Sequence, residues 1–391
     1  MKKANYLAAA LALAMLAPAC AAAQQIAVSV NDGKQTRPGE APSTRTEDYV
    51  SVIDISGRTP RVVGNVAAPT SMIGPPTSVA VASDESFAIV ASAQAIEDGV
   101  LVKNDQVSLL DLSNPAAPRV VQTIQGGSGA TGVAINRART LALVANTGDD
   151  SISIFTIANN QLTPAGRVRL DYQSRPTDVA FAPDGSFALA VQQAGNRIVR
   201  LDVNGSTVTR SNASYAPGLQ PYGVVVSRDG RYAFNTNLGG RAPTAGENAA
   251  SGGGRVSTVS VTDLSTYEVV TQIDVGMTSE HVALSPDGRY IAVVVLNGST
   301  AQPGAPNYND HSLLQIYSVN GAELTRVAEA RAGKWCQGAV FNRNNTQVVL
   351  QCAMDRQIEI YRFNGRRLTA DSRATMNFNA RPGAITTSAD R

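Results

Sequence analysis

The feature that most constrains this chain is a hairpin that recurs seven times. Its clearest copy spans residues 280–295, where two apolar, β-prone runs flank a Pro-Asp-Gly turn. Such a turn joins two antiparallel strands, because its residues supply backbone angles that the flanking residues disfavour. Aligned on the fourth residue of each first strand, the copies lie 45 to 58 residues apart, at Val79, Val133, Val179, Val224, Val282, Ala339 and Ile385.

Further strands follow each hairpin. An alternating third run comes next, for example at residues 152–156, and a weaker fourth run follows, for example at 120–124. A repeat of about 45 residues with four short strands is typical of a β-propeller blade. The sequence therefore predicts an all-β fold, a seven-bladed β-propeller of four-stranded blades.

The two ends of the chain are predicted to share one blade. Ile385 opens a first strand, but the chain stops at residue 391, so that blade lacks its other strands. Residues 26–31 match the second strand at 141–146, and residues 49–55 and 61–66 read as a third and a fourth strand. Pairing of N- and C-terminal strands would close the ring and hide its sheet edges. We expect one propeller domain over residues 24–391.

Residues 1–23 are predicted to be a signal peptide. Lys2 and Lys3 precede an apolar core at 7–17, and small residues at 21–23 form a cleavage site. The core is shorter than the ~20 residues that span a bilayer, and no membrane span is expected elsewhere. We therefore expect a periplasmic or secreted protein. Cys20 leaves a lipid anchor as an alternative.

Removal of the leader leaves two cysteines. Cys336 and Cys352 flank one hairpin, each 8 residues from its centre at Asn344. Directly opposed residues of an antiparallel pair come within disulfide reach, and an exported protein meets an oxidising compartment. We predict a Cys336–Cys352 disulfide; two buried free thiols are the alternative.

The repeats resemble those of the YVTN-type and lactonase-like seven-bladed propellers. The shared motifs read RPTDVAFAPDGSFALAV at 175–191, SEHVALSPDGRYIAVVV at 279–295, ALVANTGDDSISIF at 142–155 and YVSVIDIS at 49–56. The segment 358–369, with Ile-x-Ile-Tyr before Asn-Gly-x-x-Leu-Thr, is similar to the lactonase-like branch. The resemblance covers essentially the whole mature chain. It implies the fold strongly and the activity weakly, since one fold hosts many functions.

One face of the ring is predicted to carry the site. Long insertions at 32–48, 93–105, 238–254 and 298–310 share the face on which each first strand starts. Binding sites often lie on such loops, although tolerated surface insertions are the alternative. The predicted ligand-binding residues at this channel mouth are Arg175, Gln220, Lys334, Trp335 and Arg381. The basic ones would hold a carboxylate or phosphate, or else be solvated or bridge blades; Trp335 would stack on a ligand or plug the core.

Glu280 and His281 are the catalytic candidates. Histidine exchanges a proton near neutral pH. The lactonase resemblance implies a histidine at the start of a first strand, with glutamate and arginine in the channel. That family's arginine directly before the histidine is replaced here by Glu280. A channel histidine bonded to a neighbouring strand is the alternative for His281.

Three functions remain open on the sequence. The first is a propeller that binds a small anionic ligand or a periplasmic protein; the second is a lactone hydrolase; the third is the large subunit of a periplasmic redox complex. A net charge of +2 gives no reason to expect nucleic acid. We expect no cofactor, because no haem-attachment or phosphate-loop motif is present. No metal site is expected, although Asp310 and His311 share the face of His281.

Overall fold

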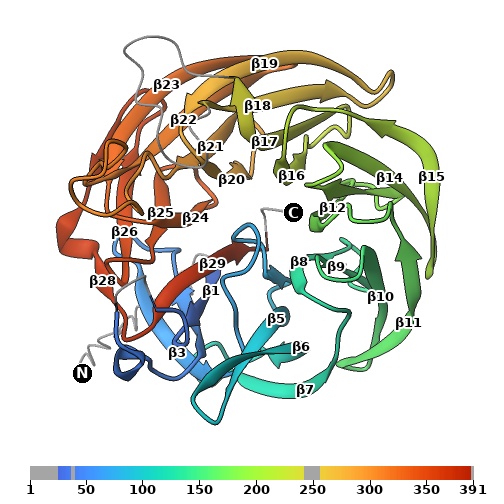
Figure 1. Ribbon diagram of the computed structural model, residues 1–391, viewed down its shortest axis with the longest axis horizontal. Helices are drawn as coiled ribbons and strands as arrows, with labels where there is room; N and C mark the ends of the chain where they lie inside the picture. The colour runs from blue at the N-terminus through green and yellow to red at the C-terminus, as the bar shows by residue number, and fades with distance from the viewer. Residues whose placement is uncertain (1–24, 37–39, 242–255, 389–391) are drawn as a thin grey trace, which may run out of the picture.

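The computed structural model describes residues 25–36, 40–241 and 256–388. Seven antiparallel sheets stand around a central axis (Figure 1), which confirms the predicted propeller. We number the blades from the first complete one, so that the shared blade is the seventh. The predicted signal peptide lies outside the described residues. The described helices are the short 3-10 turns η1 (Pro42–Thr44) and η2 (Ser372–Ala374), and no helix among the described residues is long and apolar enough to cross a membrane.

Each sheet runs outward from an inner strand that lines the axis. The inner strands are β4 (Val79–Val81), β8 (Ala130–Ile135), β12 (Pro176–Phe181), β16 (Pro221–Val226), β20 (Ser279–Leu284), β24 (Cys336–Phe341) and β29 (Arg381–Thr387). The second strands are β5 (Phe87–Glu97), β9 (Leu141–Asn146), β13 (Phe187–Gln192), β17 (Tyr232–Arg241), β21 (Tyr290–Val295), β25 (Gln347–Cys352) and β1 (Ile26–Asp32).

The outer half of each blade is less regular. The third strands are β6 (Val100–Asp111), β10 (Ser151–Ala158), β14 (Arg197–Asn204), β18 (Val256–Asp263), β22 (Ser312–Asn320), β26 (Gln357–Phe363) and β2 (Tyr49–Asp54). The fourth are β7 (Arg119–Gln125), β11 (Gln161–Arg169), β15 (Thr207–Tyr215), β19 (Glu268–Gly276), β23 (Glu323–Ala332), β27 (Leu368–Ala370) with β28 (Met376–Asn377), and β3 (Arg61–Ala67). In blade six, η2 interrupts the fourth strand, so β27 and β28 pair separately with β26.

The burial pattern explains why the hairpins are the strongest sequence signal. Strands β8 and β9, like most inner and second strands, are buried at every residue, because both faces pack against neighbouring blades. A strand buried on both faces reads as a continuous apolar run. The outer strand β7 instead alternates exposed and half-buried residues. The core therefore lies between the blades, in clusters that each join two of them.

The termini close the ring as predicted. Strand β29 pairs antiparallel with β1, with Val28 opposite Thr386 and Ser29 opposite Ile385; Figure 1 shows the two side by side. The Gln351 amide of blade six also donates to Ser29 Oγ at 2.8 Å and to the Ala384 carbonyl at 2.9 Å. The first and last described strands, β1 and β29, are thus buried side by side in one sheet.

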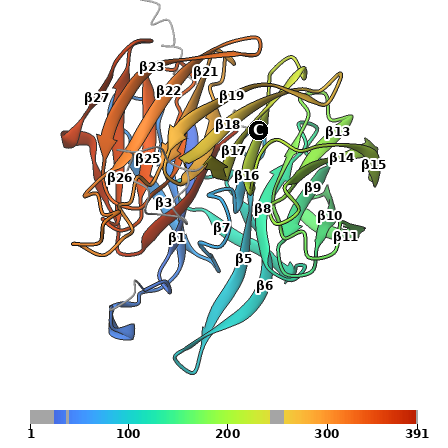
Figure 2. The same cartoon turned by 45° about the horizontal axis from the view of Figure 1, so that its top comes forward.

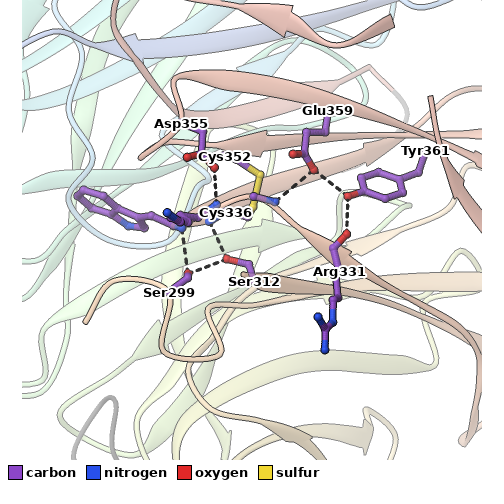
Figure 3. Close-up of a disulfide and its surroundings, with 11 residues drawn as sticks. Ser299, Ser312, Arg331, Cys336, Cys352, Asp355, Glu359 and Tyr361 are labelled. Carbon is purple, nitrogen blue, oxygen red and sulfur yellow. Dashed lines mark hydrogen bonds between the residues drawn. A yellow bond between two sulfur atoms is a disulfide. The ribbon is translucent and has the colours of Figure 1, made fainter. Parts of the chain in front are cut away.

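The predicted disulfide is confirmed. Cys336 and Cys352 are direct partners in the β24–β25 register and are both fully buried. Figure 3 shows the bond near Ser299 and Ser312 of blade five. Ser312 Oγ accepts the Cys336 N–H at 3.1 Å. The disulfide therefore cross-links strands β24 and β25 of blade six close to the point where blade six contacts blade five.

The insertions differ from simple loops. Residues 93–105 mostly prolong β5 and β6 into a hairpin that projects from the ring (Figure 2). The insertion of the shared blade contacts it, since Arg45 donates to the Gly99 carbonyl at 2.7 Å and Gln35 to Gln94 at 3.0 Å. Most of the predicted insertion at 238–254 lies outside the described residues.

Candidate functional site

The channel side chains are positioned by bulges in the inner strands. In blade five the register shifts between Ser279 and His281, so Glu280 has no partner on β21. Equivalent shifts occur in β8, β12, β16 and β24. A bulge re-aims side chains away from the regular alternation and often lies beside a functional site. In this protein the bulge lies just before the residue on which the repeats were aligned, Val282 in blade five, and it turns the preceding side chains toward the axis.

The bulges also free backbone N–H groups, and neighbouring blades satisfy them. Asp178 Oδ2 accepts the Val224 N–H at 3.0 Å, and His281 Nδ1 accepts the Ala339 N–H at 3.0 Å. Both acceptors occupy the residue before the alignment position and bridge to the next blade. A buried N–H without a partner would be costly. His281 is therefore the counterpart of Asp178, and its blade-bridging alternative is what the structure shows.

This contact restricts what His281 can do. The bond from Ala339 requires an unprotonated Nδ1, so a neutral ring carries its proton on Nε2. The side chain is 6% exposed and lines a central cavity of about 10 Å³. Such a volume holds about one water molecule. His281 in this arrangement presents no free lone pair at Nδ1 for a catalytic base.

Asp178 narrows the middle of the channel. Its Oδ1 accepts the Thr77 hydroxyl of blade one at 2.9 Å, reaching past blade two. Blade two has Gly132 at this position, where a Cβ would come within 2.7 Å of the Asp178 Cα. Only glycine leaves room for this crossing. The channel is consequently constricted between its two mouths.

Glu280 lies in the upper mouth, on the side where the inner strands start. Its side chain is 8% exposed and makes no hydrogen bond or ion pair with any residue that the structure describes. Burial raises the pKa of Glu280 to about 8. The carboxyl is therefore mostly protonated at neutral pH, and its O–H is available to donate a hydrogen bond.

Tyr222 and Arg175 share this electrostatic environment. Burial raises the pKa of the Tyr222 phenol, the charge of Glu280 raises it further, and Arg175 opposes the shift. Sequence reasoning missed Tyr222 and Asp178. The repeat alignment contains a signal for both, since Tyr222 occupies the position of Glu280 one blade earlier and Asp178 occupies that of His281.

Arg381 is placed differently from the other predicted ligand-binding residues. It is 2% exposed and donates to the carbonyls of Gln35 at 3.1 Å and Ala353 at 3.2 Å. It also forms an ion pair with Glu40 at 2.5 Å. Its guanidinium thus links β29 to the insertion of the shared blade and to blade six. We interpret Arg381 as a blade-bridging residue, the alternative that the sequence left open.

The remaining predicted residues stand where each inner strand begins. Arg175, Gln220 and Trp335 have φ of 50°, 53° and 52°, a left-handed conformation uncommon outside glycine. A side chain from outside the strand fixes each one: Asp150 accepts the Arg175 N–H, Asn196 that of Gln220, and Ser299 that of Trp335. Arg175 and Gln220 are exposed, whereas Lys334 and Trp335 are half-buried. We call these residues, which lie just before the start of inner strands, the rim of the upper mouth.

The second histidine does not join the first. His311 Nδ1 lies 2.7 Å from Asp310 and its Nε2 lies 3.3 Å from the Asn297 amide. Its hydrogen bond is the main reason that the pKa of Asp310 is lowered. Within the described ranges no group of three or more His, Cys, Asp or Glu side chains is placed to hold a metal.

Comparisons with known proteins agree with the class that the fold defines. The family model described as lactonase, seven-bladed β-propeller, matches residues 104–226, from the third strand of blade one to the inner strand of blade four. The resemblance inferred from the repeats is thereby confirmed. No curated protein matches the sequence.

Solved structures extend the likeness over the whole ring. A candidate 6-phosphogluconolactonase from Bacteroides uniformis has a TM-score of 0.70 at 16% identity and covers 93% of this chain and 99% of its own. The periplasmic gluconolactonase PpgL of Pseudomonas aeruginosa has a TM-score of 0.69 at 14% identity, covering 94% and 100%. At these identities the likeness establishes the fold.

Proposed function

We propose that this propeller binds a small, oxygen-rich anion, such as a sugar acid, at its upper mouth. The observation that carries the proposal is Glu280, a carboxyl group buried beside the channel with no partner among the described residues. A buried polar group without a hydrogen bond is costly, and perturbed carboxyls cluster at functional sites. A ligand oxygen would satisfy it.

The neighbouring groups favour an acceptor-rich ligand. Protonated Glu280 and the Tyr222 phenol can each donate a hydrogen bond to a ligand, and Arg175 adds a cation on the rim. A carboxylate accepts such bonds, and a charge-assisted bond is about twice as strong as a neutral one. Trp335 and Gln220 remain candidate contacts for the rest of the ligand.

Calorimetric titration with gluconate and other sugar and aromatic acids tests the proposal. We expect Arg175→Gln, which removes the cation, and Glu280→Leu, which removes the donor, to weaken binding about tenfold or more. Arg169→Gln on β11 and Glu268→Leu on β19 are the matched controls, because both residues are exposed on outer strands. Absence of binding by the wild type, or equal affinity in Arg175→Gln and its control, would contradict the proposal.

Lactone hydrolysis is the second candidate, favoured by the family match and by Glu280. A group with a pKa of about 8 can exchange a proton near neutral pH. Ionised Glu280 would activate water, while Arg175 and Tyr222 would stabilise the oxyanion of the opening ring. The substrate class would be a sugar or aromatic-acid lactone.

The two functions predict opposite pH profiles. Anion binding weakens above pH 8, because ionised Glu280 no longer donates and repels the ligand. Hydrolysis instead accelerates as Glu280 ionises and levels off above its pKa. Lactone turnover measured by proton release, with Glu280→Gln as the background, separates them. A pH-independent affinity with no turnover would exclude a role for Glu280 in either.

We also propose that the protein is exported as a single domain. Residues 1–23 would be its leader, and the disulfide supports an oxidising destination. Amino-terminal sequencing of the secreted protein tests this, with cleavage before Gln24 as the expected result. A mature chain that still begins at Met1 would refute it.

A further inference from the structure

A second cavity lies at the opposite mouth of the channel. It has a volume of about 440 Å³ and lies on the face where inner strands turn into second strands. Its lining comes from the turns of blades one to five and from Ser388 near the end of the shared blade. Small-molecule sites occupy concave pockets of about 300–1,000 Å³. This lower mouth is therefore large enough for a ligand, whereas the central cavity is not.

The charged residues in the cavity lining are Arg137, Arg228 and Asp287, so positive charge is in excess. Arg137 projects from the turn of blade two, is exposed, and makes no side-chain hydrogen bond or ion pair with the part of the chain that the structure describes. Other turn arginines are paired, as Arg139 is with Asp84 and Arg289 with Asp287. Arg137 thus offers an unused bidentate donor at the cavity wall.

A second arginine, Arg228 of blade four, also lines the cavity. Arg228 is half-buried and donates to the Ser285 carbonyl at 3.2 Å. Its side chain crosses Gly288, where a Cβ would come within 2.9 Å of Cγ, so the glycine makes room for it. The acidic residue in the lining, Asp287, accepts hydrogen bonds from Ser285 and Arg289 of its own turn. Although burial opposes it, hydrogen bonds from Arg289 and Ser285 lower the pKa of Asp287 to about 2.

Apart from Ser83 and Ser388, the remaining lining residues are apolar. Ile135, Phe181, Pro183, Val225 and Val226 contribute to this apolar wall, and Phe181 is 7% exposed. Apolar walls with a few convergent polar groups are typical of small-molecule sites. A hydrated inorganic ion would leave these walls unused. An anionic group joined to an apolar body would fill both parts.

We propose that the lower mouth is a binding site for a small organic anion, in which Arg137 grips a carboxylate, sulfonate or phosphate and the apolar wall holds the hydrocarbon or aromatic body. This site is independent of the upper mouth. The Asp178–Thr77 bond and the 10 Å³ central cavity separate the two.

Fluorescence titration with 8-anilinonaphthalene-1-sulfonate, an aromatic sulfonate, tests the proposal on the folded protein. We expect saturable binding that weakens about tenfold in Arg137→Gln and by a smaller factor in Arg137→Lys, which keeps the charge but loses the paired donors. Ser83→Glu is a second variant, because it places an acid on the same wall and keeps the arginine. Arg169→Gln is the control, and circular dichroism verifies the fold of each variant.

Three outcomes would overturn the proposal. They are the absence of saturable binding, equal affinity in Arg137→Gln and Arg169→Gln, and binding that arises only when residues 389–391 are deleted, since the chain's own terminus would then be the occupant. Failure of the proposed upper site can be told apart from failure of the lower one, because the two ligands are titrated separately. Glu280→Leu should weaken sugar-acid binding about tenfold or more without changing the fluorescence titration, and Arg137→Gln should do the reverse.

Discussion

The two mouths of the channel use the same seven inner strands but offer different chemistry. At the upper mouth, bulges turn polar side chains toward the axis and leave Glu280 buried without a partner among the described residues. At the lower mouth the strands are regular and end in tight turns around a 440 Å³ cavity. The upper end thus presents the buried carboxyl of Glu280 near the Tyr222 phenol, and the lower end presents an open cavity lined by Arg137 and Arg228. Local strand geometry therefore decides the chemistry of each end.

The largest effect should come from Arg381→Ala, which would impair both mouths together. Arg381 joins β29 to the insertion of the shared blade and to blade six. Removing one partner of a buried ion pair typically costs about 3–5 kcal/mol. Urea unfolding should show a lower midpoint with an unchanged slope. Arg169→Ala should stay within about 0.5 kcal/mol of the wild type, and an equal loss in both variants would contradict this role.

Removal of the disulfide should affect the upper mouth alone. Cys336 and Cys352 are 16 residues apart, and a loop of this size predicts a loss of about 3 kcal/mol in the double Cys→Ser variant. Because Trp335 and Gln337 flank Cys336, sugar-acid binding should also weaken. The fluorescent sulfonate should bind as before. A loss at the lower mouth would mean that the two ends are coupled.

Thr77→Val should weaken the partition between the mouths. It removes the hydroxyl that donates to buried Asp178, while keeping the shape of the side chain. Loss of a buried hydrogen bond to a charged group typically costs about 2 kcal/mol. Thermal unfolding measures the change, and Thr163→Val on an exposed outer strand is the control. No difference between the two would show that the crossing contributes nothing to stability.

Per pH unit, the smallest effect is the pH dependence of stability that Glu280 imposes. Its pKa is about 8 when folded and near 4.5 when unfolded, so between these values the native state alone holds the proton. Stability should therefore fall as pH rises through this window, by at most about 1.4 kcal/mol per pH unit, and level off above it. Glu280→Gln should flatten the curve relative to Glu268→Gln. If Glu280→Gln left the slope of stability against pH unchanged, a group other than Glu280 would be responsible for the titration.

Most of the fold was predictable because its signals are local. Turn residues, apolar runs and the spacing of Cys336 and Cys352 all act within one hairpin. The sharing of a blade by the two termini also followed, because residues 26–31 repeat a motif whose partner strands were missing. The candidate site was predicted less well. Glu280 and Arg175 lie at the upper mouth, but Arg381 is engaged by Glu40, an insertion residue whose position no repeat pattern specifies.

By itself, the sequence determined the number of blades, the closure of the ring and the disulfide, since each depends on strand periodicity and on short-range register. Only the tertiary structure decided which side chains face the axis. A bulge adds one residue to a strand without a distinct sequence signal, and it reverses the direction of the side chains beside it. The lower cavity arises from turns of five separate blades, so its arginines become neighbours only when the ring is complete.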